Sequence, residues 1–236
     1  MFARRWFSSV YDKIRCRFGL FAAGMPAWMV GRLSVLVLSG MSFCLFVSAG
    51  CKAGGARMAE DLPAGLFQDG DLAFRRGTGL TSRVVLAADK SGAYSHVGIL
   101  KWMDGKWHVI HAVPGEPDYR GDEDRVKAEA IESFFARTRA ASGAVMRVED
   151  APEPARRAAG HALRLFRSGV LFDHEYDLTD TVRMYCTELV DYVYKLEGVD
   201  LSEERLSKID IPLFDGYYLL PNDIARSERL RLIYVF

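Results

Sequence analysis

The chain has 236 residues, of which 31 are Lys or Arg and 31 are Asp or Glu, so its formal net charge is zero. The first 50 residues hold six of the basic and one of the acidic residues, which leaves 25 basic and 30 acidic side chains in the remainder. Because the sequence has no basic patch, we expect no nucleic-acid partner. The 186 residues after position 50 are enough for one domain with a substantial core.

The first 50 residues have the pattern of a secretory signal. Basic residues are frequent up to Arg32, an apolar run follows over 33–47, and the small residues 48–50 lead to Cys51. A cysteine in this place resembles the lipobox of bacterial lipoproteins, in which the cysteine is lipidated and becomes the mature N-terminus. We therefore predict a signal peptide over 1–50, lipidation at Cys51 and a flexible tether over 51–65. The protein would be a membrane-anchored lipoprotein of the cell envelope, facing the periplasm or the exterior.

Two alternatives for the N-terminus are open. The apolar stretch 33–50 would also suit an uncleaved membrane anchor, although a spanning helix needs about 20 residues. Translation from Met25 or Met29 would give a shorter leader. In each case the two other cysteines of the first 50 residues leave with the leader or stay in the membrane region. Cys186 is then predicted to be a free thiol.

The folded part of the chain begins with elements that lead to a β-hairpin. In chain order we predict a strand, a short helix and two further strands, over 70–74, 81–88, 97–100 and 107–113. Asp104-Gly105 between the last two apolar runs is a strong indication of a two-residue hairpin turn. That turn sets a register in which Gly98 faces His111.

Two histidines come together in this register. His96 and Gly98 point to the same face of the sheet because side chains alternate along a strand. His111 is then the diagonal neighbour of His96, with about 7–8 Å between the backbones. Two imidazoles at this separation can share a hydrogen bond, and Gly98 leaves space above the sheet.

The second half of the sequence mixes helices and strands. In chain order we predict a helix over 126–139, a strand over 145–148, a helix over 152–167, an acidic loop over 173–180, a helix over 186–196 and a closing strand over 230–236. The fold class is therefore α+β, an antiparallel sheet packed against helices.

Cys186, at the predicted start of a helix, has the surroundings of a nucleophile. The positive end of the helix dipole would lower the pKa of its thiol, and a nearby histidine, oriented by a third group, would complete a thiolate–imidazolium pair. The backbone N–H of Cys186 would stabilise an oxyanion. The alternative is a small buried apolar residue. A metal site is the rival use of the histidines, but the sequence has neither CxxC nor HExxH, so we predict no metal and no cofactor.

Four short motifs, in this order along the chain, resemble one known family. They are Gly70–Phe74, Ser95–Ile99, Val109–Ala112 and Tyr185–Val190. Together they resemble the YiiX/YaeF group, permuted members of the NlpC-type papain-like cysteine hydrolases. In unpermuted relatives the cysteine helix precedes the histidine strands, whereas here it follows them. The resemblance covers Leu66 to the C-terminus and implies a circularly permuted papain-like domain over 66–236.

The resemblance also implies roles for individual residues. Cys186 would be the nucleophile, His96 the base and His111 the polar third residue. This third position is often Glu in the permuted group, while the unpermuted family often has His. Glu116 and Asp118 in the adjacent loop are therefore alternative candidates.

Three further residues are candidates for substrate binding, each with a plainer alternative. Asp71 follows a turn glycine and would equally serve as a local cap. Tyr94 and Tyr185 flank the two catalytic residues and would equally pack in the core. Apart from these three candidates, the arginines Arg75, Arg76 and Arg83 could bind a substrate carboxylate or phosphate, although a solvated surface is the default for such residues.

With the resemblance, these features predict an extracytoplasmic cysteine hydrolase that cleaves peptide or N-acyl amide bonds through a thioester on Cys186. Its partners would be an amide-containing substrate, such as a cell-wall peptide or an N-acyl or lipid compound, and the membrane that anchors its N-terminus. Two other functions are open: a lipid-directed acyltransferase or amidase that uses the same Cys–His site, and a ligand-binding lipoprotein without catalysis.

Overall fold

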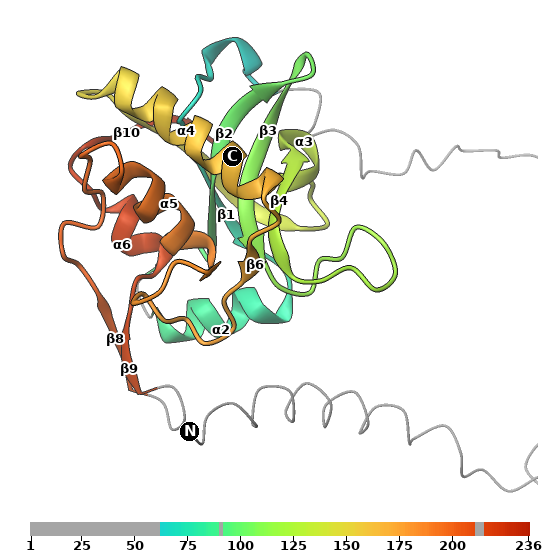
Figure 1. Ribbon diagram of the computed structural model, residues 1–236, viewed down its shortest axis with the longest axis vertical. Helices are drawn as coiled ribbons and strands as arrows, with labels where there is room; N and C mark the ends of the chain where they lie inside the picture. The colour runs from blue at the N-terminus through green and yellow to red at the C-terminus, as the bar shows by residue number, and fades with distance from the viewer. Residues whose placement is uncertain (1–61, 90–91, 211–214) are drawn as a thin grey trace, which may run out of the picture. The chain divides into compact units, whose positions relative to one another are not determined.

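The computed structural model describes residues 62–89, 92–210 and 215–236 (Figure 1). The predicted signal peptide, the lipidation site Cys51 and the tether before residue 62 lie outside these ranges. No helix within the described ranges is long and apolar enough to cross a membrane. The described residues form a mixed α+β fold, which confirms the predicted fold class.

The centre of the described fold is an eight-stranded sheet with the strand order β10-β5-β1-β2-β3-β4-β6-β7. Neighbouring strands are antiparallel, except that β6 and β7 are parallel. A separate small sheet pairs β8 with β9. In chain order the strands are β1 (Leu72–Gly77), β2 (His96–Met103), β3 (Lys106–Val113), β4 (Arg125–Ala130), β5 (Ala140–Val148), β6 (Leu171–Phe172), β7 (Arg183–Met184), β8 (Ser207–Ile209), β9 (Gly216–Tyr218) and β10 (Leu230–Val235).

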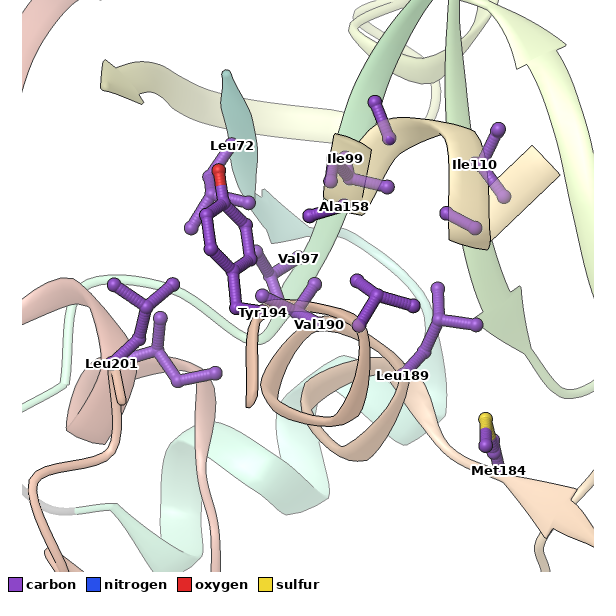
Figure 2. Close-up of a cluster of buried hydrophobic side chains, with 14 of the residues drawn as sticks. Leu72, Val97, Ile99, Ile110, Ala158, Met184, Leu189, Val190, Tyr194 and Leu201 are labelled. Atoms are coloured by element: carbon purple, nitrogen blue, oxygen red, sulfur yellow. The ribbon is translucent and has the colours of Figure 1, made fainter. Parts of the chain in front are cut away.

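The larger core lies between one face of the sheet and two helices, α4 and α5, which Figure 1 shows side by side. Alanines at helical spacing form the buried face of α4, and their small side chains let this helix lie close to the sheet. Figure 2 shows Val97 of the sheet near Tyr194 and Val190 of α5, and Ile99 near Ala158 of α4. The helices are η3 (Ala64–Leu66), α2 (Leu80–Ala88), α3 (Ile131–Phe134), α4 (Pro152–Arg167), α5 (Cys186–Lys195) and α6 (Pro221–Ala225).

A second, smaller core lies on the opposite face of the sheet. It joins side chains of the central strands to the aromatic rings of Phe134 and Phe135. Side chains alternate along β2, so Val97 and Ile99 point to the α4–α5 side. His96 belongs to the other side, and its ring contacts Phe134, with 5.7 Å between the centroids.

The β2–β3 hairpin has the predicted register. The paired strands run from Met103↔Lys106 to Ile99↔Ile110. The two turn residues, Asp104 and Gly105, have φ angles of 51° and 77°, the left-handed values that a two-residue hairpin turn requires. This register determines which residues of β3 lie opposite the beginning of β2.

The predicted helix over 126–139 is wrong. The chain instead forms β4 up to Ala130, followed by the single helical turn of α3. Apolar residues do recur here at helical spacing, but β4 pairs with β3 along its whole length, from Val113↔Arg125 to His108↔Ala130. Non-local sheet pairing outweighs the local pattern. This difference matters for the site, because it changes which side chains face the histidines.

The remaining predicted elements are close to those observed. The helices expected over 81–88, 152–167 and 186–196 correspond to α2, α4 and α5. The strand expected over 145–148 is the end of the longer β5, and the acidic loop over 173–180 connects β6 to β7. These local elements were predictable because their apolar residues recur at a regular spacing.

Candidate active site

The candidate nucleophile, Cys186, is the first residue of α5, as predicted. Glu188 Oε2 accepts a hydrogen bond from the backbone N–H of Tyr185 at 3.2 Å and closes the N-terminus of the helix. Within the described part of the chain Cys186 is a free cysteine, and it keeps part of its surface exposed. The helix is held against the sheet by its buried face, which consists mainly of Leu189, Val190, Val193 and Tyr194.

The surroundings of the Cys186 thiol raise its pKa. Burial of the sulfur is the largest influence and raises the pKa to about 11. The backbone N–H groups of Val97, Thr187 and Cys186 itself act in the opposite direction, as does the charge of Arg75, but they do not compensate. The expectation of a thiolate at the helix N-terminus is therefore wrong, because desolvation of the charged form outweighs the helix dipole. The thiol is protonated near neutral pH.

His96 and His111 form a buried pair. Nε2 of His96 lies 2.8 Å from Nδ1 of His111, and the two rings are nearly perpendicular at 80°. The predicted hydrogen bond between the imidazoles is confirmed. Gly98 makes this approach possible, because a Cβ there would lie 2.9 Å from the Cβ of His111 and 2.8 Å from the carbonyl oxygen of Ile110.

Both imidazoles are uncharged at neutral pH. Burial lowers the pKa of His96 well below its ordinary value of 6.5, and the charge of Arg75 lowers it further. Burial also lowers the pKa of His111, although a contact with Glu129 opposes the change. Phe134 encloses the pair from one side, with its centroid 5.3 Å from that of His111. Each ring therefore carries one N–H and one lone pair.

Glu129, which was not predicted from the sequence, has its Oε1 3.0 Å from Nε2 of His111. Burial acts to raise the pKa of Glu129, but the contact with His111 and the charges of Arg139 and Arg75 outweigh it and lower the pKa to about 2. The mistaken helix over 126–139 concealed this residue. On a strand paired with β3, Glu129 lies opposite Val109 and on the same face as His111.

Glu116 holds two arginines behind this site. Its Oε1 lies 2.7 Å from Nη2 of Arg75 and its Oε2 lies 2.6 Å from Nη2 of Arg139. Arg75 is buried, and its guanidinium lies over the ring of Phe134 at 4.5 Å. Arg75 is therefore not on a solvated surface. Asp118, the other alternative for the third position, lies 3.4 Å from Nζ of Lys127.

Cys186 and the histidines approach the beginning of β2 from opposite faces of the sheet. The backbone N–H of Val97 acts on the sulfur, which places the thiol at the peptide group that joins His96 to Val97. Among the described residues the thiol makes no direct hydrogen bond to the His96 ring.

The three candidates for substrate binding lie in different places. Asp71 is buried at the far end of β1 from His96, where its two oxygens accept bonds from Nε and Nη2 of Arg147 at 2.7 and 2.8 Å. The structure does not bring it to the site. Tyr94 is half-buried with its ring 5.3 Å from that of Phe74.

Tyr185 is the candidate that adjoins the nucleophile. It is buried, its ring packs edge-on against Tyr176 at 5.2 Å, and burial raises the pKa of its hydroxyl. Both Tyr94 and Tyr185 therefore pack against core residues. The role of each in substrate binding stays a prediction.

Comparison with known proteins supports the fold of this domain. No family model matches the chain, and no curated protein matches its sequence. Among solved structures, the fold is similar to the crystal structure of metalloprotein yiiX from Escherichia coli O157:H7, DUF1105, with a TM-score of 0.56. The two chains are 23% identical, and the match covers 71% of this chain and 96% of yiiX. This likeness extends across nearly all of yiiX, and we conclude that the two proteins share a fold.

Proposed function

We propose that this protein is a cysteine hydrolase of amide bonds. In this proposal Cys186 is the nucleophile, His96 the base and His111 the residue that orients the base. The observation that carries the proposal is the buried hydrogen bond of 2.8 Å between the two histidines, next to the strand position that the thiol contacts. Two imidazoles in contact, with the thiol at the peptide group that joins His96 to Val97, supply the residue types that a Cys–His hydrolase requires.

The first step joins proton transfer to nucleophilic attack. With a pKa of about 11, only about one Cys186 in 10,000 is a thiolate at pH 7. Neutral His96 therefore takes the thiol proton as the sulfur bonds to the carbonyl carbon and the carbonyl π electrons move to oxygen. The backbone N–H of Cys186, at the start of α5, is the donor for the resulting oxyanion.

The later steps return the site to its starting state. Protonated His96 gives its proton to the leaving nitrogen as the C–N bond breaks, which leaves a thioester on Cys186. A water molecule then attacks the thioester while His96 accepts its proton. The carbonyl re-forms as the C–S bond breaks, the carboxylic acid departs, and the proton on His96 returns to the sulfur.

The substrate and location remain part of the proposal. We infer an amide-containing compound of the cell envelope, a cell-wall peptide or an N-acyl or lipid compound, reached by a domain anchored to the membrane through Cys51. One observation favours a second candidate: the protonated thiol of Cys186 also suits a ligand-binding lipoprotein without catalysis. Acyl transfer to an amine would use the same thioester and is distinguished by its product.

The name metalloprotein belongs to yiiX, and we do not extend it to this chain. The described residues contain no group of three or more His, Cys, Asp or Glu side chains placed to hold a metal ion. In addition, Nε2 of His96 and Nδ1 of His111 are bonded to each other. This donor set does not fit a metal centre, so no step of the proposed mechanism uses one.

The proposal is tested by trapping the thioester. The full-length chain in detergent would be incubated with a panel of peptide amides, N-acyl amines and lipid esters, with quenching in acid and peptide-level mass spectrometry. We expect an acyl adduct on Cys186 in the wild type, no adduct in Cys186→Ser, and a strongly reduced rate in His96→Gln. Free acid as product indicates hydrolysis, and an acylated amine indicates transfer. Labelling that is equal in wild type and His96→Gln would contradict catalysis and favour the ligand-binding alternative.

A further inference from the structure

Glu129 lies behind the two histidines, with its Oε1 3.0 Å from Nε2 of His111. We propose that Glu129 is a positioning residue that selects the tautomers of both His111 and His96, so that Nδ1 of His96 carries the lone pair. This inference rests on the proposed function for its catalytic meaning. Its structural content, the placement of two protons, can be measured independently of any substrate.

The placement follows from counting donors and acceptors along the chain of contacts. Ionised Glu129 can only accept a hydrogen bond, so Nε2 of His111, 3.0 Å from Oε1, must carry the proton. Neutral His111 then has its lone pair on Nδ1. Nε2 of His96, 2.8 Å from that nitrogen, must be the donor. The lone pair of neutral His96 is therefore on Nδ1, the nitrogen that remains to accept a thiol proton.

The opposite placement would leave unfavourable contacts. A proton on Nδ1 of His111 would put the lone pair of Nε2 against a carboxylate oxygen in a buried site. Among the described residues, Nε2 of His111 and Oε1 of Glu129 are both buried without an aligned hydrogen-bond partner, and the two atoms lie 3.0 Å apart. Each is therefore the other's available partner, and buried polar atoms need such partners.

Two arginines keep Glu129 ionised and hold it in place. Arg139 contacts its Oε2, and Nη1 of Arg75 lies 3.8 Å from its Oε1. Lys127, which faces His111 in the strand register, turns its ammonium group to Asp122 at 2.7 Å. The negative charge in contact with the histidine pair is therefore the Glu129 carboxylate, while the guanidinium charges of Arg75 and Arg139 oppose protonation of His96.

This arrangement supplies the negative charge that a pair of histidines lacks. When His96 accepts the thiol proton, its Nε2–H remains hydrogen-bonded to the neutral ring of His111, and Nε2 of that ring lies 3.0 Å from the Glu129 carboxylate. The imidazolium is thus stabilised through one intervening residue. For histidines that bind metals, removal of the outer group that orients the ring typically costs about 10- to 100-fold in affinity or activity, and we expect a loss of similar size here.

The test exchanges Glu129 for glutamine and uses Glu116 as the matched control. Both acids bind Arg75 and Arg139, but only Glu129 lies against His111. In E129Q the arginine at the Oε2 position attracts the amide oxygen, so the amide NH2 points at His111. That group is a donor, and we expect both imidazoles to move their protons from Nε2 to Nδ1. E116Q removes the same charge and should leave both tautomers unchanged.

The tautomers are read from nitrogen-15 NMR of the full-length chain in micelles, labelled at histidine. The spectrum is assigned with single replacements of the three other histidines, His108, His161 and His174. The inference is supported if the protonated and unprotonated nitrogens exchange in E129Q alone. It is overturned if the wild-type rings carry their protons on Nδ1, if E129Q keeps the wild-type tautomers, or if E116Q changes them equally.

Two further measurements keep the outcome decisive. If E129Q does not fold, the NMR scalar coupling across the hydrogen bond between the two rings of the wild type still tests the tautomers. The proposal requires that the shared proton is covalently bound to Nε2 of His96 and not to Nδ1 of His111. Acylation of Cys186 in folded E129Q should fall about 10- to 100-fold, whereas E116Q should remain within a few fold. If the wild type has the expected tautomers but no acyl adduct forms on Cys186, the proposed function is contradicted and the tautomer assignment still holds.

Discussion

The pH dependence of Cys186 alkylation tests the electrostatic description of the site. Burial of the sulfur raises the pKa of the thiol to about 11, whereas a free cysteine has a pKa of about 8.5. At pH 7 about 3% of free cysteine is thiolate, compared with about 0.01% at a pKa of 11, a difference of about 300-fold. Since the thiolate is the reacting species, iodoacetamide should modify Cys186 about 300-fold more slowly than a free thiol.

The assay would measure alkylation of the full-length chain in detergent, with the Cys186 peptide quantified by mass spectrometry. The pH range is 6 to about 10, in which thiolate formation governs the rate. The rate should rise about tenfold for each pH unit, with no plateau near neutrality. The same peptide in denaturant is the control and should follow the profile of a free thiol. A fast reaction that is constant below pH 8, and that disappears in His96→Gln, would refute the reasoning, because it would show a preformed ion pair.

Three predictions concern stability, each measured by urea unfolding. Gly98→Ala should destabilise the protein by about 1–3 kcal/mol through overpacking, whereas Gly160→Ala, in an open helical position, should stabilise it by about 0.5–1 kcal/mol; equal effects would contradict the close approach of the hairpin strands. Asp71→Asn should lower the free energy of unfolding by about 2–3 kcal/mol by breaking the bonds to Arg147, and it should not change the reactivity of the Cys186 thiol. A change in thiol reactivity would show that Asp71 does contribute to the site. Burial raises the pKa of Glu188 from 4.5 to about 8, so the folded state binds more protons than the unfolded state. Stability should fall as pH rises through this interval, by about 2 kcal/mol because solvent screens part of the full effect. Glu188→Gln should remove that slope, and a wild type without it would contradict the burial argument.

Part of the site could be predicted from the sequence because it depends on short-range geometry. Asp104-Gly105 specifies a two-residue turn, and alternation along the strands then brings His96 and His111 together. The apolar spacing after Cys186 specifies a helix that begins at this residue. Each of these inferences uses residues within one hairpin or one helix.

The misassigned segment shows where this kind of inference ends. Residues 126–139 contain apolar side chains at helical spacing, yet β4 occupies their first part because β3 offers backbone partners along its whole length. That pairing partner lies elsewhere in the chain, and no local pattern reports it. The same error concealed Glu129, because its position on the face of His111 exists only in the strand.

By itself the sequence determined the fold class, the hairpin register and the position of Cys186 at the start of a helix, since these follow from local periodicity and turn chemistry. Only the tertiary structure decided that Glu129 stands behind His111, that Asp71 is paired with Arg147, and that the thiol is protonated. The physical reason is that burial and long-range charge depend on which distant segments come together. A helix start favours a thiolate, but the packing around the sulfur removes the solvent that a thiolate needs.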